Sequence, residues 1–262
     1  MSIQYVRSKW LRTEAVARDR RVRAYVPETA IFAAGSLTRM LNSYNTVYVK
    51  PDHGNHGTGV MRVWRSKAGG KYSVQSGSRT RSYRSVGALY TALQAARIGR
   101  QRYLVQRGIR LCRYEGRPFD LRIMVQSNPE HKWEVTGMLA RVAGSRGVVT
   151  NVRHGGAVVS MDRVCRSIGM NLSQIAALRS RLRKVGLRTS SAMLRRFKRI
   201  KELGLDVGLD KSRRPWIIEV NTSPDLSLFL RVKDHREFRK MYKYALAYGK
   251  KFPPRKSKRS KK

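Results

Sequence analysis

The chain has 262 residues and carries 57 Lys and Arg against 16 Asp and Glu, a formal net charge of +41. Its hydrophobic content of 41% excludes disorder throughout, no apolar run is long enough to span a membrane, and the N-terminus lacks the apolar core of a signal peptide. We therefore expect a folded cytoplasmic protein that contacts polyanions, which could be nucleic acid, an anionic surface or an acidic protein layer.

In the first half of the chain, short apolar runs alternate with turns. Pro51 ends one strand, and residues 52–59 contain too much Gly and Asn for regular structure, so they predict a loop. The predicted elements, in chain order, are a short helix at Leu11–Arg18, an amphipathic helix at Ala30–Tyr44, a strand at Thr46–Pro51, a β-hairpin of Val60–Ser66 and Lys71–Ser76, a helix at Ser85–Arg97 and a strand at Tyr103–Ile109.

The second half predicts long strands, one long helix and a final hairpin. A glycine-rich segment occupies residues 144–156, and Gly186 is expected to break the long helix. The predicted elements are strands at Phe119–Ser127 and Trp133–Val142, a helix at Ser173–Leu203, a hairpin over residues 204–221 and a last helix at Asp234–Tyr248. Because hairpins dominate, we expect an α+β protein with antiparallel sheets.

A lysine at the end of a strand precedes a glycine loop. Lys50 and Pro51 are followed by Asp52-HGNHGTGV, whose glycines let backbone N–H groups approach an anion closely. Val60 and Met61 stand where a Walker A loop would carry Lys and then Ser or Thr, so this is a different kind of loop. Taken alone, a phosphate-binding loop and an ordinary surface hairpin loop explain the pattern equally well.

Two further segments could meet an anion. Arg122 shares a strand face with Asp120 and could clamp a phosphate or a carboxylate, although a solvent-facing ion pair explains the two residues as well. The loop at 150–156 gathers Asn151 and two cationic groups beside paired glycines, although a Gly-Gly turn in a basic protein is the simpler interpretation.

Four of the sixteen acidic residues lie between Asp206 and Asp225, which is unexpected in so basic a chain. Folded as a hairpin, this stretch brings Asp206, Glu219 and Asn221 to one end of two paired strands, because residues two apart share a face. Two carboxylates and an amide oxygen are hard ligands suited to Mg²⁺ that also holds nucleotide phosphates. The alternative is that the carboxylates only pair with arginines, but Asn221 and the turn after it favour a metal site.

The order of these motifs resembles the ATP-grasp superfamily. More narrowly, Tyr48-VKPDHGNHGTGVMRV, Gln106-RGIRLCRYEGRPFDLRIMVQ and Gly204-LDVGLDKSRRPWIIEVNTSPD resemble the YheC/YheD family, described as endospore coat-associated in spore-forming bacteria. The resemblance implies two α+β subdomains with antiparallel sheets that sandwich a nucleotide, and an N-terminal substrate domain that is reduced or absent. The expected organisation is a basic N-terminal extension (1–25), an ATP-grasp domain (26–230), a C-terminal helix (231–248) and a disordered basic tail (249–262).

The resemblance also implies a role for each motif. Arg122 would face the transferred phosphoryl group or the acyl phosphate, with Asn151 and Arg141 nearby. Mg²⁺ would be held by Asp206, Glu219 and Asn221, whereas Asp210 would cap the turn of the hairpin. The residues implied to bind ATP are Lys50 at the phosphates, His53, Gly54, Asn55, Gly57, Thr58 and Gly59 in the loop above them, and Gln106, Arg107 and Ile109 at adenine.

The implied reaction joins a carboxylate to an amine through an acyl phosphate, using ATP and Mg²⁺. The two substrates are unidentified and could include a peptide or a protein, and a spore-coat or other polyanionic partner is expected. The alternative is a non-catalytic coat or scaffold protein that uses the fold and its basic surface to bind polyanions. A nucleic-acid-binding protein is a third interpretation, which rests on charge alone, because the basic helix at Ser173–Leu203 lacks interleaved aromatic residues.

Overall fold

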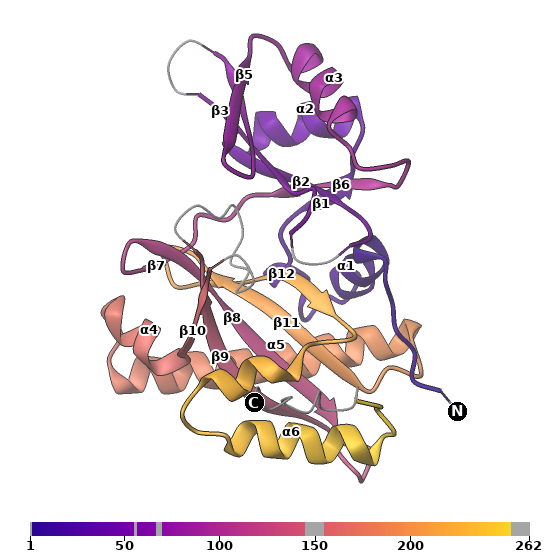
Figure 1. Ribbon diagram of the computed structural model, residues 1–262, viewed down its shortest axis with the longest axis vertical. Coiled ribbons are helices and arrows are strands. Elements are labelled where there is room, and N and C mark those ends of the chain that lie inside the picture. Colours follow the sequence, from indigo (N-terminus) through magenta and orange to yellow (C-terminus); the bar gives the residue numbers. More distant parts are fainter. Residues whose placement is uncertain (1, 55–56, 67–69, 145–154, 253–262) are drawn as a thin grey trace, which may run out of the picture.

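The computed structural model describes residues 2–54, 57–66, 70–144 and 155–252. They form two lobes, each built on its own sheet, with the helix α1 (Lys9–Ala17) beside the junction of the lobes (Figure 1). All described strand pairs are antiparallel, so the predicted α+β class with antiparallel sheets is confirmed. Within these residues, no helix combines the length and the apolar character needed to cross a bilayer.

The first lobe is a six-stranded sheet with the order β1-β6-β2-β3-β4-β5. Its elements are β1 (Thr29–Ile31), α2 (Ala34–Ser43), β2 (Thr46–Pro51), β3 (Met61–Arg65), β4 (Tyr72–Ser76), β5 (Arg79–Tyr83), α3 (Val86–Ala95) and β6 (Tyr103–Arg107). Alternation along β2 places Val47 and Val49 in the core that α2 and α3 cover. The same alternation sends Tyr48 and Lys50 to the opposite face, which lines the space between the lobes.

The second lobe has the strand order β10-β9-β8-β11-β12, and β7 pairs with β8 outside that order. Its strands are β7 (Arg113–Tyr114), β8 (Arg117–Ser127), β9 (Trp133–Val142), β10 (Ala157–Ser160), β11 (Glu202–Leu209) and β12 (Pro215–Asn221). Its helices are α4 (Met161–Ser167), α5 (Leu172–Arg196) and α6 (Arg236–Ala247), and two short 3-10 turns, η1 (Arg23–Tyr25) and η3 (Leu226–Arg231), accompany them.

Alternation along β8 divides its residues between two helix layers. Leu121 and Ile123 face the large core shared with α1, α4 and α5. Met124 faces the smaller core beneath α6 and η3. Asp120 and Arg122 share the face of Met124 by the same alternation, but they line the cleft between the lobes.

The prediction for the long helix was wrong in two respects. The helix α5 runs without a break through Gly186 and ends at Arg196, and Leu203 lies in β11. A Cβ atom at Gly186 would lie 3.1 Å from Cγ2 of Val125 and 3.2 Å from Cγ2 of Val135. Gly186 therefore permits close packing of the helix on the sheet and does not end the helix.

Short elements at the edges of segments were missed. The predicted helix at Ala30–Tyr44 begins only at Ala34, because Thr29–Ile31 pairs with β6 as a strand. The strand β5 carries Arg, Thr and Ser on a largely exposed edge, so it lacks the apolar alternation by which a strand is predicted.

At the C-terminal end, Lys250 pairs with Glu202 and Phe252 packs against Tyr242, whereas residues 253–262 lie outside the described residues.

Candidate functional site

A cleft of about 2670 Å³ lies between the lobes and is lined by both of them and by α1. Ligand pockets commonly have volumes of about 300–1,000 Å³, so the cleft has room for more than one small molecule. Its described lining residues include fifteen Lys or Arg and four Asp or Glu. This surplus of positive charge favours an anionic ligand.

Three charged side chains form a row across the second sheet. Arg122 on β8 pairs in register with Asp206 on β11, and Asp206 pairs in turn with Glu219 on β12. Directly paired residues of antiparallel strands share a face, so the three side chains point to the same side. Asn221 follows two residues after Glu219 and pairs with Gly204. The hairpin thus juxtaposes Asp206 and Glu219 as the sequence suggests, with Asn221 next along the strand.

A bulge in this hairpin connects the row with the first lobe. Asp206 pairs with Glu219 but the next residue, Val207, pairs with Ile217, which leaves Ile218 without a partner in β11. A bulged residue is not held in the regular ladder. The carbonyl of Ile218 accepts a hydrogen bond from Nζ of Lys50 at 3.4 Å, so the strand of one lobe contacts the lysine of the other.

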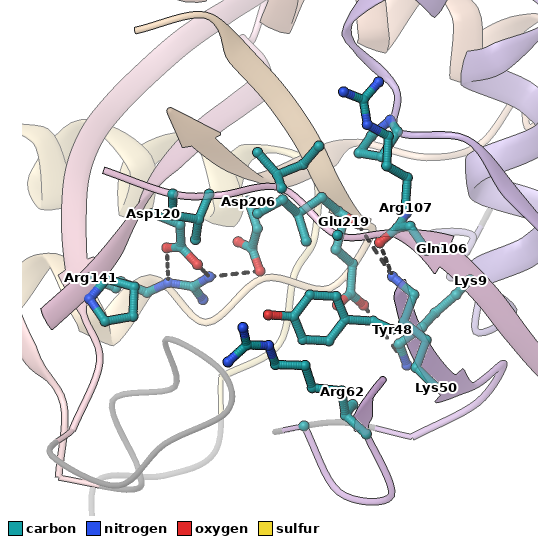
Figure 2. Close-up of a pocket in the computed structure, with 18 of the residues that line it drawn as sticks. Lys9, Tyr48, Lys50, Arg62, Gln106, Arg107, Asp120, Arg141, Asp206 and Glu219 are labelled. Carbon is teal, nitrogen blue, oxygen red and sulfur yellow. Dashed lines mark hydrogen bonds and ion pairs between the residues drawn. The ribbon is translucent and has the colours of Figure 1, made fainter. Parts of the chain in front are cut away.

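Arginines surround Asp206 on both sides. Its Oδ1 accepts from Nε of Arg122 at 2.7 Å, and its Oδ2 lies 2.8 Å from Nη2 of Arg141. Arg141 also donates to both carboxylate oxygens of Asp120, at 2.8 and 2.7 Å (Figure 2). Burial favours the neutral form of Asp206, but the ion pairs with Arg122 and Arg141 outweigh it and hold the pKa of this carboxyl below its usual range. The two arginines therefore lie at the centre of the site with fixed orientations.

Lys50 reaches the cleft from the first lobe. It is 7% exposed, and its Nζ donates to Oε1 of Gln106 at 2.8 Å, while Nε2 of Gln106 donates to Thr29 Oγ1 at 2.9 Å. Burial, opposed by the nearby charge of Glu219, lowers the pKa of Lys50 to about 8. A lysine that is buried and cationic at neutral pH, in a cleft lined by more cations than carboxylates, is suited to hold an anion.

The described part of the glycine loop lies beside Lys50. Gly54, Gly57 and Gly59 all have positive φ angles, of 112°, 77° and 74°, which side-chain-bearing residues rarely adopt. His53, Gly54, Gly57 and Thr58 line the cleft. Asn55, predicted to take part, lies outside the described residues.

The residues that the resemblance places at adenine also line the cleft. Gln106 holds Lys50 as described above, and Arg107 and Ile109 follow it along the chain. The guanidinium of Arg107 lies 4.9 Å from the ring centre of Tyr44 and 4.8 Å from that of Trp216. Arg107 thus joins an aromatic ring of each lobe through cation–π contacts.

Four cleft residues escaped the sequence reasoning. Tyr48 and Arg62 are a cross-strand pair on β2 and β3. Both reach into the space between Lys50 on one side and Asp206 and Arg141 on the other (Figure 2). The strict alternation of β2 and β3 could have identified them, since Tyr48 shares a face with Lys50. Lys9 and Arg12 of α1 enter the site from a segment interpreted as an extension, and no local pattern points to the cleft.

The predicted metal ligands have the right chemistry but are already occupied by internal partners. Oε1 of Glu219 lies 3.3 Å from Nη2 of Arg12, and Oδ1 of Asn221 accepts from the backbone N–H of Ser223 at 2.9 Å. Within the described residues, no group of three or more His, Cys, Asp and Glu could hold a metal ion. Carboxylate oxygens have spare lone pairs, so the set fits a hard cation that arrives together with an anion. Asn151, predicted to lie nearby, falls outside the described residues.

Asp210 caps the turn of the hairpin, as predicted. Its Oδ1 accepts from the backbone N–H groups of Ser212 and Arg214, and its Oδ2 accepts from Nε1 of Trp216 at 2.8 Å. Asp225 likewise accepts from the N–H of Ser227 at the start of η3. These two carboxylates stabilise turns, which leaves Asp206 and Glu219 as the acidic residues of the row.

Comparison with known protein sequences identifies similar proteins over most of the chain. A family model described as YheC/D like ATP-grasp matches residues 3–252. The endospore coat-associated protein YheD of Bacillus subtilis (strain 168) is 25% identical over 228 residues, which cover 85% of this chain and 49% of YheD. The endospore coat-associated protein YheC of the same organism is 22% identical over 232 residues, which cover 87% of this chain and 63% of YheC. The chain thus spans about half of one relative and less than two thirds of the other.

Solved structures share the arrangement of the two lobes at low sequence identity. The C-terminal domain of K. lactis Pby1, an ATP-grasp enzyme interacting with the mRNA decapping enzyme Dcp2, superposes with a TM-score of 0.56 at 14% identity and covers 93% of this chain and 74% of that domain. N5-carboxyaminoimidazole ribonucleotide synthetase from Thermotoga maritima gives a TM-score of 0.52 at 11% identity, over 92% of this chain and 49% of the synthetase.

Proposed function

The chain belongs to the YheC/D-like ATP-grasp family, and from this membership we propose that it binds ATP with Mg²⁺ and ligates a carboxylate to an amine. The family and the ATP-grasp fold, both predicted from the motifs, are confirmed. One observation carries the proposal: Lys50 of the first lobe faces the paired row of Arg122, Asp206 and Glu219 on the second lobe across a strongly cationic cleft.

The charge of the cleft supports a polyphosphate as the ligand. Lys9, Arg12 and Lys50 are each at most 7% exposed, and Glu219 is the nearby carboxylate that they share. Asp52 and Asp206 also lie near some of these cations, but Asp206 is already paired with Arg122 and Arg141. Burying a surplus of cations is costly unless a further anion joins them. The triphosphate of ATP supplies that charge. His53, Gly54, Gly57 and Thr58 of the glycine loop line the same cleft, and glycines let backbone N–H groups approach an anion closely.

In the proposed reaction, a carboxylate oxygen of one substrate attacks the γ-phosphorus of ATP, the bond to the bridging oxygen breaks, and ADP leaves. The amine nitrogen of the second substrate then attacks the acyl carbon, the bond from that carbon to the phosphate oxygen breaks, and an amide, phosphate and a proton are released. Lys50 would neutralise the phosphates, and Arg122 and Arg141 would face the transferred phosphoryl group. Because Asp206 and Asp120 already orient the guanidinium groups of Arg122 and Arg141, these groups would not have to reorient during the reaction.

The metal ion would occupy the oxygen set of Asp206, Glu219 and Asn221. When bound, Mg²⁺ would neutralise the charge that develops on the phosphate oxygens. Because Arg12 and Arg122 lie against the two carboxylates, the protein offers little net negative charge to a free cation. We therefore expect Mg²⁺ to bind as the complex with ATP and not ahead of it.

The two relatives suggest a context for the ligase. YheD and YheC are each named as endospore coat-associated, so we propose that this chain acts in the cytoplasm on a spore-coat component that supplies the carboxylate, the amine or both. The volume of the cleft, about 2670 Å³, is large enough for a peptide segment beside the nucleotide.

Calorimetric titration with ATP in the presence of Mg²⁺ tests the binding proposal. The wild-type chain should bind, and Glu219→Gln, which keeps the size of the side chain but removes its charge, should bind at least tenfold more weakly. The matched control is Glu115→Gln, which alters an exposed glutamate on the β7–β8 turn. Absent binding by the wild type, or equal binding by Glu219→Gln, would refute the site. ADP release in the presence of amino acids, small carboxylates and acidic peptides would then test ligation.

A scaffold that binds polyanions is the second candidate, because α5 presents a basic face to solvent. Its exposed cations follow the helix along one side and continue past its end: Arg181, Arg183, Lys184, Arg188, Arg195, Arg196, Lys198 and Arg199. Such a surface supports phosphate or carboxylate contacts without sequence specificity. Salt-sensitive binding of polyglutamate or DNA that is weakened by Arg183→Gln and Lys184→Gln, together with absent ATP binding, would favour this function over the ligase.

A further inference from the structure

The helix α1 is fastened to both lobes at the edge of the cleft. On the side of the first lobe, Asp52 accepts from the backbone N–H of Trp10 at 2.7 Å and from Oγ of Ser8 at 3.0 Å, and the N–H of Lys9 donates to the carbonyl of Asp52 at 2.9 Å. Asp52 is 2% exposed and immediately precedes the glycine loop. The start of α1 is therefore tied to the base of that loop.

The segment just before α1 and the helix itself are attached to the second lobe. The N–H of Val6 donates to Oγ1 of Thr222 at 2.8 Å, directly after β12. Val16 packs in the large core with α5, and Glu14 pairs with Arg196 at the end of α5. A single helix of nine residues thus bridges the glycine loop and the strand that carries Glu219.

Two cations of α1 point into the cleft. Lys9 and Arg12 are three residues apart, so they lie on one face of the helix. Nζ of Lys9 donates to the carbonyl of Gly54 in the glycine loop and lies 3.9 Å from Oε1 of Glu219. Arg12 lies 3.3 Å from the same oxygen, and its Nε donates to the carbonyl of Ser8 at 3.2 Å. Figure 2 shows Lys9 beside Lys50 and Glu219.

Cations outnumber carboxylates in this part of the cleft. Lys9 and Arg12 are 7% and 5% exposed, and burial lowers the pKa of each despite the opposing charges of Glu219 and Asp52. Oε1 of Glu219 is their common contact, and the charge of Glu219 also acts on Lys50. Asp206 is already paired with Arg122 and Arg141, so the grouping leaves positive charge for an anion with several negative oxygens.

We infer that α1 supplies part of the polyphosphate-binding site: Lys9 and Arg12 contact the phosphates of the nucleotide, and the helix holds the glycine loop at a fixed distance from Glu219. This inference rests on the proposed binding of ATP. It assigns a ligand-binding role to two residues near the start of the chain, which lie outside the sequence motifs that identify the nucleotide site. The ligand class is a nucleoside triphosphate or another linear polyphosphate, recognised by charge and not by its base.

The test compares three probes, ATP, inorganic tripolyphosphate and AMP, in calorimetric titrations with Mg²⁺. Lys9→Met keeps the apolar stem of the side chain and removes its charge, and Arg12→Gln does the same for the guanidinium. Each should weaken ATP and tripolyphosphate about 10- to 100-fold, the loss of one charged hydrogen bond, and leave AMP within about twofold. Arg18→Gln is the matched control, because this arginine at the opposite end of the same helix is exposed and pairs only with Glu14 among the described residues.

The titrations distinguish a failure of this inference from a failure of the proposed ATP binding. If the wild type binds ATP and both variants, folded by circular dichroism, bind it equally well, the inference is overturned and ATP binding stands. If the wild type binds neither ATP nor tripolyphosphate, the proposed function falls and the inference with it. Should Arg12→Gln fail to fold, Lys9→Met alone decides the matter, since the head group of Lys9 contacts one backbone carbonyl and one carboxylate edge and its removal leaves the core intact.

Discussion

Replacing Asp206 by Asn should destabilise the second lobe strongly. The carboxylate accepts one hydrogen bond from Arg122 at 2.7 Å and contacts Arg141 at 2.8 Å, and the side chains of the three residues are 16%, 6% and 12% exposed. An asparagine removes the negative charge, which leaves Arg141 paired with Asp120 and takes from the largely buried Arg122 its ion pair with Asp206. Breaking a buried ion pair from one side costs about 3–5 kcal/mol, and we expect a loss of that order here.

The assay is urea unfolding of the nucleotide-free protein at neutral pH, followed by tryptophan fluorescence. The pKa of Asp206 in the folded protein lies below the usual value of about 3.9, so its stabilising contribution is complete above about pH 4 and is lost as the pH falls through the folded pKa. Neutral pH therefore reports the full effect. Asp234→Asn is the control, because this exposed aspartate pairs with Arg236 at the surface and its loss should leave unfolding unchanged. A loss below about 1 kcal/mol for Asp206→Asn would refute the reasoning.

Three further predictions follow from the same contacts. Affinity for ATP should fall as the pH rises through about 8, where Lys50 loses its proton, and Lys50→Arg should remove this dependence because a guanidinium stays charged; an equal pH dependence in both proteins would contradict the assignment. Gly186→Ala should lower the free energy of unfolding by about 1–3 kcal/mol, because the added Cβ would press against Val125 and Val135, whereas an added Cβ at Gly35 has no atom within 4 Å and should not lower it. Equal stability of the two variants in urea titrations would show that α5 can shift. Calorimetry with Mg²⁺ alone should show no binding, and a tight site without nucleotide would contradict the account of Asp206 and Glu219.

The hairpin of β11 and β12 shows what the sequence could predict. Two apolar runs around a polar turn, with carboxylates at the far end, are sufficient to pair the strands and to juxtapose Asp206 with Glu219, because alternation and turn position set the register. The same alternation predicts that Lys50 leaves the core. Both features depend on residues that lie close together in the sequence, so the order of the residues is sufficient to predict them.

Other features depend on contacts between distant segments. Gly186 reads as a helix breaker in isolation, and only the approach of Val125 and Val135 explains its place within α5. Lys9 and Arg12 look like part of a basic N-terminal extension. Their entry into the cleft depends on contacts with Asp52 and Thr222, which lie 40 to 213 residues further along the chain. Such tertiary contacts leave no periodic signal in the segment itself.

A crystal structure of the protein soaked with Mg²⁺ and a non-hydrolysable ATP analogue would show directly whether the cleft binds the nucleotide. We expect the triphosphate between Lys50 and the row of Arg122, Asp206 and Glu219, within hydrogen-bond distance of Lys50, and the metal on Asp206, Glu219 or Asn221. A nucleotide bound outside this cleft, or a cleft that stays empty at saturating ligand, would contradict this expectation.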